Sequence, residues 1–167
     1  MHASKKSVIP SVIPKASWRN PLHLLATGLG AGASPVAPGT MGTLVAIPIY
    51  VWAASLSTEG YALFVLLLAV MGIGLCHKTA KDWGVHDHAS IVWDEIVGYL
   101  ITLFAMPIHW GWMLLGFGVF RFFDIVKPWP IRWVDRRVTG GFGIMLDDVL
   151  AGLASCLVLH GLASLIG

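Results

Sequence analysis

Hydrophobic residues are arranged along this chain in four long runs that contain no Asp, Glu, Lys or Arg. The runs cover residues 41–58, 60–77, 96–120 and 149–167. A helix needs roughly 20 consecutive apolar residues to cross a bilayer. The second and fourth runs meet this length, and the first, which Pro48 interrupts, is marginal. The pattern predicts an all-α membrane protein with helices in these runs.

The third run is interrupted in its middle. Pro107 and Gly111 break the run, and Trp110 and Trp112 are of the residue type that lies at the headgroup level of a membrane. These residues favour a short helical hairpin over residues 95–123, and a single kinked span is the alternative. With the hairpin, the chain is a multi-pass helical bundle of about four to five membrane segments.

The composition supports a membrane protein. Hydrophobic residues make up 56% of the 167 residues and charged residues only 12%, whereas soluble proteins average about 25% charged residues. The mean hydropathy is +0.76. A net charge of +2 is too small to indicate a nucleic-acid partner. Residues 1–20 are expected to form a basic N-terminal arm, poorly ordered or lying on a surface, with a short interfacial anchor as the alternative. Residues 21–167 are expected to form a single membrane-embedded domain.

Lysine and arginine residues are concentrated in three segments of the chain. They lie in residues 1–20, 78–94 and 121–148, and the turns at 57–60 and 106–112 contain none. Loops rich in Lys and Arg face the cytoplasm. The distribution therefore predicts that these three segments share the cytoplasmic face and that the C-terminus emerges on the other side.

The acidic residues follow the same division. Of the nine Asp and Glu residues, all but Glu59 lie in the predicted cytoplasmic segments or at their junctions with apolar runs. Helix capping explains single acids at helix N-termini, but it does not explain Asp124 at a helix end or two adjacent pairs beside apolar runs. Several oxygen ligands without cysteine indicate a hard cation such as Mg²⁺. The predicted catalytic acids are Asp94, Glu95, Asp124, Asp147 and Asp148, of which all but Asp124 are predicted metal ligands.

Basic residues and a glycine-rich segment accompany these acids. Arg121 and Lys127 flank Asp124 at a spacing of three residues, and Arg132 follows in the same segment. Such cations neutralise phosphoryl charge, although binding to anionic lipid headgroups is the alternative. Residues 28–44 are glycine-rich, and backbone N–H groups around Gly39 and Thr40 are candidate phosphate ligands, with a purely structural loop as the alternative.

Four motifs in order resemble one bacterial family. They are "SPVAPGTMGTL", "IVWDEIVGY", "FRFFDIVKPWPIRW" and "GGFGIMLDDVLAG", and together they resemble the phosphatidylglycerophosphatase A family over about residues 22–165. The resemblance implies a Mg²⁺-dependent phosphatase of the bacterial inner membrane that removes the terminal phosphate of phosphatidylglycerophosphate, giving phosphatidylglycerol. Its lipid substrate would stay in the bilayer while the headgroup reaches the cytoplasmic edge. The oligomeric state is left open.

The expected chemistry distributes roles among these residues. Asp94, Glu95 and either Asp147 or Asp148 would bind Mg²⁺, and Arg121 and Lys127 would hold the phosphate. A remaining carboxylate would activate water, or Asp124 would form an aspartyl-phosphate. One rival class is a non-catalytic membrane protein, either an ion-binding transporter, which would place polar residues near the midplane, or a lipid-binding assembly factor. The other is a phosphatidyltransferase, whose usual acidic motif is absent.

Overall fold

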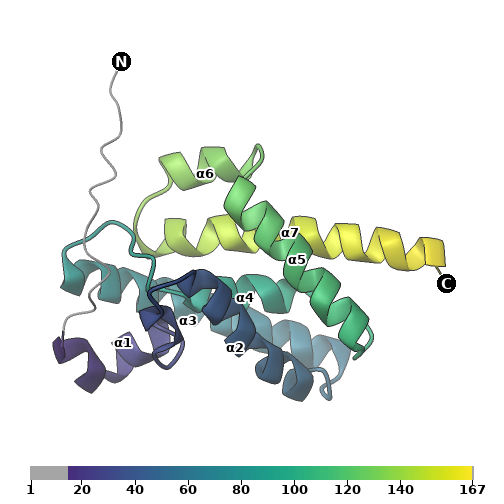
Figure 1. Ribbon diagram of the computed structural model, residues 1–167, viewed down its shortest axis with the longest axis horizontal. Coiled ribbons are helices and arrows are strands. Elements are labelled where there is room, and N and C mark those ends of the chain that lie inside the picture. The colour runs from purple at the N-terminus through teal and green to yellow at the C-terminus, as the bar shows by residue number, and fades with distance from the viewer. Residues whose placement is uncertain (1–14, 167) are drawn as a thin grey trace.

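The computed structural model describes residues 15–166, and this part of the chain is entirely helical (Figure 1). No strand occurs in it, which confirms the all-α class. The helices are η1 (Lys15–Arg19), α1 (Pro21–Ala26), η2 (Ala31–Ala33), α2 (Pro38–Ala53), α3 (Thr58–Trp83), α4 (Trp93–Thr102), α5 (Trp110–Val126), α6 (Ile131–Arg137) and α7 (Gly140–Ile166).

The short helix α4 lies at the centre of the bundle. It contacts α2, α3, α5 and α7, and every residue from Ile96 to Leu100 is buried. Gly98 and Gly152 allow the backbones of α4 and α7 to approach closely, because a Cβ at Gly98 would lie 2.8 Å from the carbonyl oxygen of Asp148. This contact fixes the start of α4 next to the second turn of α7.

The expected break in the third apolar run is present. Helix α4 ends at Thr102 and α5 begins at Trp110. Helix α5 then runs back along α4, since Gly116 lies against Leu103 and Gly98 against Phe120. The Tyr99 hydroxyl donates to the carbonyl oxygen of Met113 at 2.8 Å. The two helices thus form an antiparallel pair whose far end lies near residues 93 and 126.

Two helices are long and apolar enough to cross a membrane. They are Thr58–Trp83 and Gly140–Leu165, with mean hydropathies of 2.1 and 1.9 over their most apolar windows. The first contains the predicted span 60–77, and the second contains residues 149–165 of the predicted span 149–167. In α3 the exposed positions include Leu63, Leu66, Leu67 and Val70, each more than half exposed. Their spacing places them on one face of the helix, where they suit contact with lipid.

The last helix begins earlier than the hydrophobic pattern suggests. The fourth apolar run, 149–167, predicts a helix that Asp147 and Asp148 would open, but the helix starts at Gly140 and this prediction is wrong. Close packing at the start of α7 requires glycine: a Cβ at Gly141 would lie 2.6 Å from the backbone nitrogen of His77, and one at Gly143 2.7 Å from the carbonyl carbon of Val138. Asp147 and Asp148 therefore lie two turns inside the helix and cannot serve as its cap.

The described part of the basic arm packs against the bundle. In η1, Ser17 is buried and accepts a hydrogen bond from Trp83 Nε1 at 2.8 Å. Asn20 then caps α1 by accepting from the Leu22 backbone N–H. The remainder of the predicted arm, residues 1–14, lies outside the described residues.

Candidate active site

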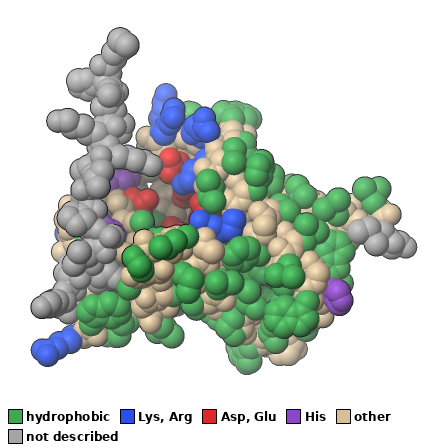
Figure 2. All heavy atoms as spheres, in the orientation of Figure 1, with side chains coloured by type: hydrophobic (Ala, Val, Ile, Leu, Met, Phe, Trp, Pro, Cys, Tyr) green, Lys and Arg blue, Asp and Glu red, His purple; other side chains and the backbone are tan. Residues whose placement is uncertain are grey.

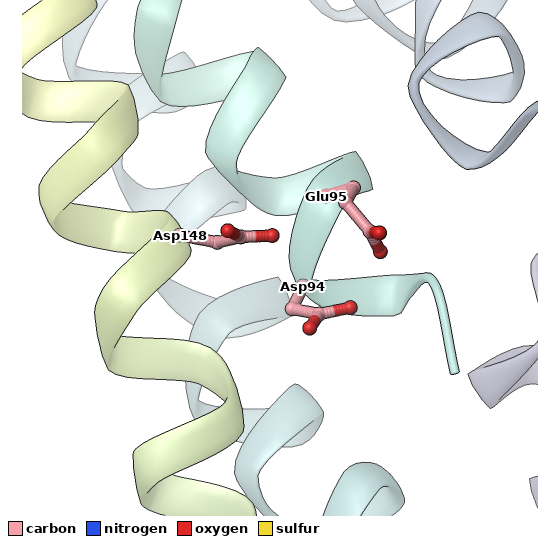
Figure 3. A group of neighbouring side chains, drawn as sticks. All are labelled: Asp94, Glu95 and Asp148. Atoms are coloured by element: carbon pink, nitrogen blue, oxygen red, sulfur yellow. The ribbon is translucent and has the colours of Figure 1, made fainter. Parts of the chain in front are cut away.

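Three carboxylates from two helices converge beside the start of α4. Asp94 and Glu95 project from its first turn and Asp148 reaches them from α7 (Figure 3). One oxygen of each lies within 4.8 Å of the others. This carboxylate triad, Asp94, Glu95 and Asp148, unites residues from two of the predicted motifs. It is the central feature of the site.

The triad is partly buried and incompletely paired. Asp148 is 3% exposed, Asp94 and Glu95 are half-buried, and among the described residues Asp94 Oδ1 and Glu95 Oε2 have no hydrogen-bond partner. A buried group of acids with free oxygens requires either protons or a cation. The all-oxygen donor set fits a hard divalent cation such as Mg²⁺.

Arg121 lies beside the triad. Its Nη1 is 3.9 Å from Glu95 Oε1 and pairs with Asp124 one turn further along α5. The side chains of Arg121, Glu95 and Asp124 are only 16%, 14% and 12% exposed. Arg121 and Asp124, three residues apart in the sequence, are therefore paired on one face of α5. This pair places one guanidinium between the carboxylate that closes α5 and the triad.

The glycine-rich segment reaches the same place through Gly39. This residue lies in the first turn of α2, where Ala37 adopts a left-handed conformation and provides no side-chain cap. A Cβ at Gly39 would overlap Glu95 Oε1 and lie 3.0 Å from Arg121 Nη1. The first turn of a helix has N–H groups without intrahelical partners. The Gly39–Thr40 backbone is thus next to the triad, and Thr40 is half-buried.

The two adjacent aspartates of α7 have different neighbours. Asp148 belongs to the triad, whereas Asp147 pairs with Lys127, whose Nζ also contacts Asp135 Oδ1 at 2.8 Å. Burial disfavours the charged amine, but Asp147 and Asp135 outweigh it and raise the pKa of Lys127 above its usual range. Lys127 therefore stays cationic. It gives Asp147 a counter-charge separate from Arg121, which lies beside the triad.

Arg132, a predicted phosphate ligand, lies away from the triad, and Asp135, which the sequence did not single out, lies near Lys127. Arg132 is exposed and its Nη2 donates to the carbonyl oxygen of Val126 at 2.8 Å, so it is not gathered with the triad. Asp135 joins Lys127, although it lies eight residues away across a proline-containing turn. No periodic pattern would have signalled that contact, since the turn between α5 and α6 sets it.

The acidic side chains gather on one face of the molecule, with Lys and Arg side chains around them (Figure 2). The site thus combines three carboxylates, one arginine and the N-terminus of a helix, at one end of an apolar helical bundle. Metal-assisted phosphoryl transfer uses groups of these kinds.

The chain belongs to the phosphatidylglycerophosphatase A family, a family of phosphatases, whose model matches residues 24–163. It is 55% identical over 142 residues to phosphatidylglycerophosphatase A of Escherichia coli, covering 84% of this chain and 83% of that protein. It is 47% identical over 152 residues to the Haemophilus influenzae protein of the same name, covering 90% and 93%. A putative phosphatidylinositol-3-phosphatase of Bacteroides thetaiotaomicron is 40% identical over 146 residues, covering 81% and 89%. No solved structure shows a significant match to the chain.

Replacing Gly39 by alanine is expected to lower phosphatase activity about tenfold. The added methyl group must displace Glu95 or Arg121, and a shift of about 1 Å in a catalytic group costs up to a hundredfold. Gly74→Ala is the matched control, because a Cβ at Gly74 meets nothing within 4 Å. Phosphate release and the thermal midpoint are measured for both variants. Equal activity of the two variants would contradict the placement of Gly39 at the site.

Proposed function

We propose that this phosphatase hydrolyses phosphatidylglycerophosphate to phosphatidylglycerol and phosphate, using Mg²⁺, at the cytoplasmic face of the inner membrane. The observation that carries the proposal is the carboxylate triad within 4.8 Å beside Arg121. The names of the two most identical relatives described above support the choice of lipid. The concentration of Lys and Arg in the segments that bear the site supports the cytoplasmic orientation.

Asp94, Glu95 and Asp148 are the residues that would hold Mg²⁺. The unpartnered oxygens of Asp94 and Glu95 support this assignment. When bound, the cation would polarise a phosphoryl oxygen and offset its charge. Asp147, the fourth predicted ligand, is assigned a supporting role, because Lys127 occupies one of its oxygens.

The phosphate is assigned to Arg121 and to the first turn of α2. Arg121 can contact a phosphoryl oxygen beside Glu95, and the Gly39 and Thr40 N–H groups face an anion in the way helix N-termini do. In the overall reaction a bond forms between phosphorus and a water oxygen. The bond between phosphorus and the glycerol oxygen breaks, and that oxygen takes up a proton.

Asp124 is the acid assigned to the reacting phosphorus. Its carboxylate lies beside Arg121 and close enough to Asp148 for their side chains to interact. It acts either as the base that activates water or as a nucleophile that forms an aspartyl-phosphate. Mass spectrometry of the enzyme stopped during turnover distinguishes the two routes, because only the second adds a phosphoryl group to Asp124.

An apolar groove on α5 supports a lipid substrate. It has a volume of about 410 Å³ and lies between α5 and α7. At one end Phe122 and Phe123 adjoin Arg121 and Asp124 in sequence. An acyl chain in the groove would leave the headgroup at the triad. The groove is lined by Leu114, Leu115, Gly118, Val119, Phe122, Phe123 and Val158.

Filling this groove is expected to impair only long-chain substrates. A side chain at Gly118 would enter open space, since its Cβ meets nothing within 4 Å. Gly118→Leu should raise the KM for a long-chain lipid phosphate about tenfold and leave a short-chain analogue unaffected. Gly161→Leu on α7 is the matched control, because its Cβ also meets nothing. Equal changes in KM for the long-chain and the short-chain substrate would contradict the assignment of this groove to an acyl chain.

The proposed activity is tested with the purified protein in mixed micelles. Phosphate release is compared for phosphatidylglycerophosphate, phosphatidylinositol 3-phosphate and phosphatidylglycerol, the last being a diester without a terminal phosphate. We expect the fastest phosphate release from phosphatidylglycerophosphate and none from phosphatidylglycerol. Faster release from phosphatidylinositol 3-phosphate would contradict this choice of substrate and favour the lipid in the name of the Bacteroides relative.

A further inference from the structure

A second pocket lies on α6 and the turn before it. It has a volume of about 410 Å³, as large as the groove on α5. Helix α6 buries Ile131 and Val134 against the rest of the protein, and the pocket occupies its outer side. The pocket is lined by Pro128, Trp129, Arg132, Trp133, Arg136 and Arg137.

The three arginines of this pocket have no carboxylate partner among the described residues. The one acid of α6, Asp135, is engaged by Lys127 instead. Arg132 is held by its bond to the Val126 carbonyl oxygen, and Arg137 lies over the Trp133 ring with 5.7 Å between the guanidinium carbon and the ring centre. The pocket therefore presents several positioned N–H donors and excess positive charge, which suits a phosphate group.

The two tryptophans indicate where this phosphate would lie. Trp129 is 84% exposed and Trp133 51%. Large aromatic side chains so exposed beside arginines are typical of the interface between lipid headgroups and water. A soluble anion would contact the arginines but not the apolar ring surfaces, whereas a phospholipid would contact both.

We propose that this pocket binds the headgroup of an anionic phospholipid of the surrounding membrane, at a site separate from the triad. The occupant is a lipid rather than a soluble phosphate because the pocket joins cationic and aromatic groups. Arg132 thereby has a role other than contact with the substrate phosphate. A lipid held here would also anchor α6, whose Asp135 reaches Lys127 and, through it, Asp147.

The test measures lipid binding without catalysis. The full chain in detergent, with EDTA present, is mixed with phosphatidylglycerol or zwitterionic phosphatidylcholine, and retained lipid is counted by native mass spectrometry. The wild type should retain phosphatidylglycerol preferentially. Arg136→Gln/Arg137→Gln should weaken that retention about tenfold to thirtyfold, since each basic residue near a membrane contributes roughly one kcal/mol. Arg19→Gln/Lys81→Gln removes the same charge from exposed positions elsewhere and should retain the lipid.

Three results would overturn the assignment of this pocket to a lipid headgroup. Equal retention by the two double variants would overturn the pocket as a lipid site, as would equal retention of both lipids by the wild type. Displacement of the lipid by millimolar inorganic phosphate would show a site for the free anion instead. Phosphatidylglycerol is also the proposed product, but both double variants keep the triad, so the difference in retention between them reports the pocket alone. Failure of the proposed phosphatase mechanism would appear separately, as absent phosphate release.

Discussion

Asp148→Asn is expected to lower phosphate release about a hundredfold to a thousandfold. Asparagine keeps the shape of the side chain but removes the charge that the triad contributes to a divalent cation. A metal-assisted transition state depends on several kcal/mol from that cation, and each 1.36 kcal/mol is tenfold in rate. Asp94→Asn should have a similar effect, because both residues supply oxygens to the same group. The rates are compared at saturating lipid with purified protein.

The neighbouring aspartate provides the control for this loss. Asp147→Asn should lower activity only about tenfold, since Asp147 faces Lys127, which retains Asp135 as a partner. In EDTA the thermal midpoint of Asp148→Asn should be no lower than that of the wild type, because one of three crowded buried carboxylates loses its charge. A large fall in the midpoint would indicate that Asp148 acts in folding and not in catalysis.

Arg121→Gln is expected to reduce phosphate release by about two to three orders of magnitude. The guanidinium is the cation nearest to Glu95 in the described ion pairs, and loss of one preorganised donor to a developing oxyanion costs roughly 2.7 to 4 kcal/mol. Arg121→Lys should restore only part of the rate, because lysine keeps the charge but lacks the further guanidinium N–H donors beside Nη1, the atom that faces both Asp124 and Glu95.

The kinetic pattern separates a catalytic from a structural role of Arg121. A loss mainly in kcat, with a partial return in the lysine variant and an unchanged helical circular dichroism spectrum, supports contact with the phosphoryl group. Lys81→Gln, which removes an exposed positive charge from α3, should leave the rate unchanged. Equal losses for the glutamine and lysine variants, accompanied by a lowered thermal midpoint, would assign Arg121 to packing.

The helices were predictable where hydrophobicity and helix-breaking residues agree. Pro107 and Gly111 marked the break that separates α4 from α5. The start of α7 was not predictable from the same signals, because glycines in "GGFG" usually indicate a turn. Here Gly141 lies too close to Ile73 and His77 of α3 for a larger side chain, and no local pattern contains this tertiary contact.

The sequence predicted which residues form the site better than it predicted which of them contact one another. Clustering of acids at one membrane face brought Asp94, Glu95 and Asp148 into a single hypothesis, and Arg121 and Gly39 lie beside them. Adjacent positions in a helix point about 100° apart, which separates Asp147 from Asp148. The sequence left open which of the two would face the triad, since that depends on how α7 is rotated against α4.

The central claim is that the triad of Asp94, Glu95 and Asp148 uses a divalent cation to remove phosphate from a lipid. The most direct measurement follows phosphate release from phosphatidylglycerophosphate by the purified wild type in EDTA, and again after Mg²⁺ is added in excess. We expect no release in EDTA and full return with Mg²⁺, and in Asp148→Asn a return to only about a hundredth to a thousandth of the wild-type rate. Release at an undiminished rate in EDTA would contradict this claim.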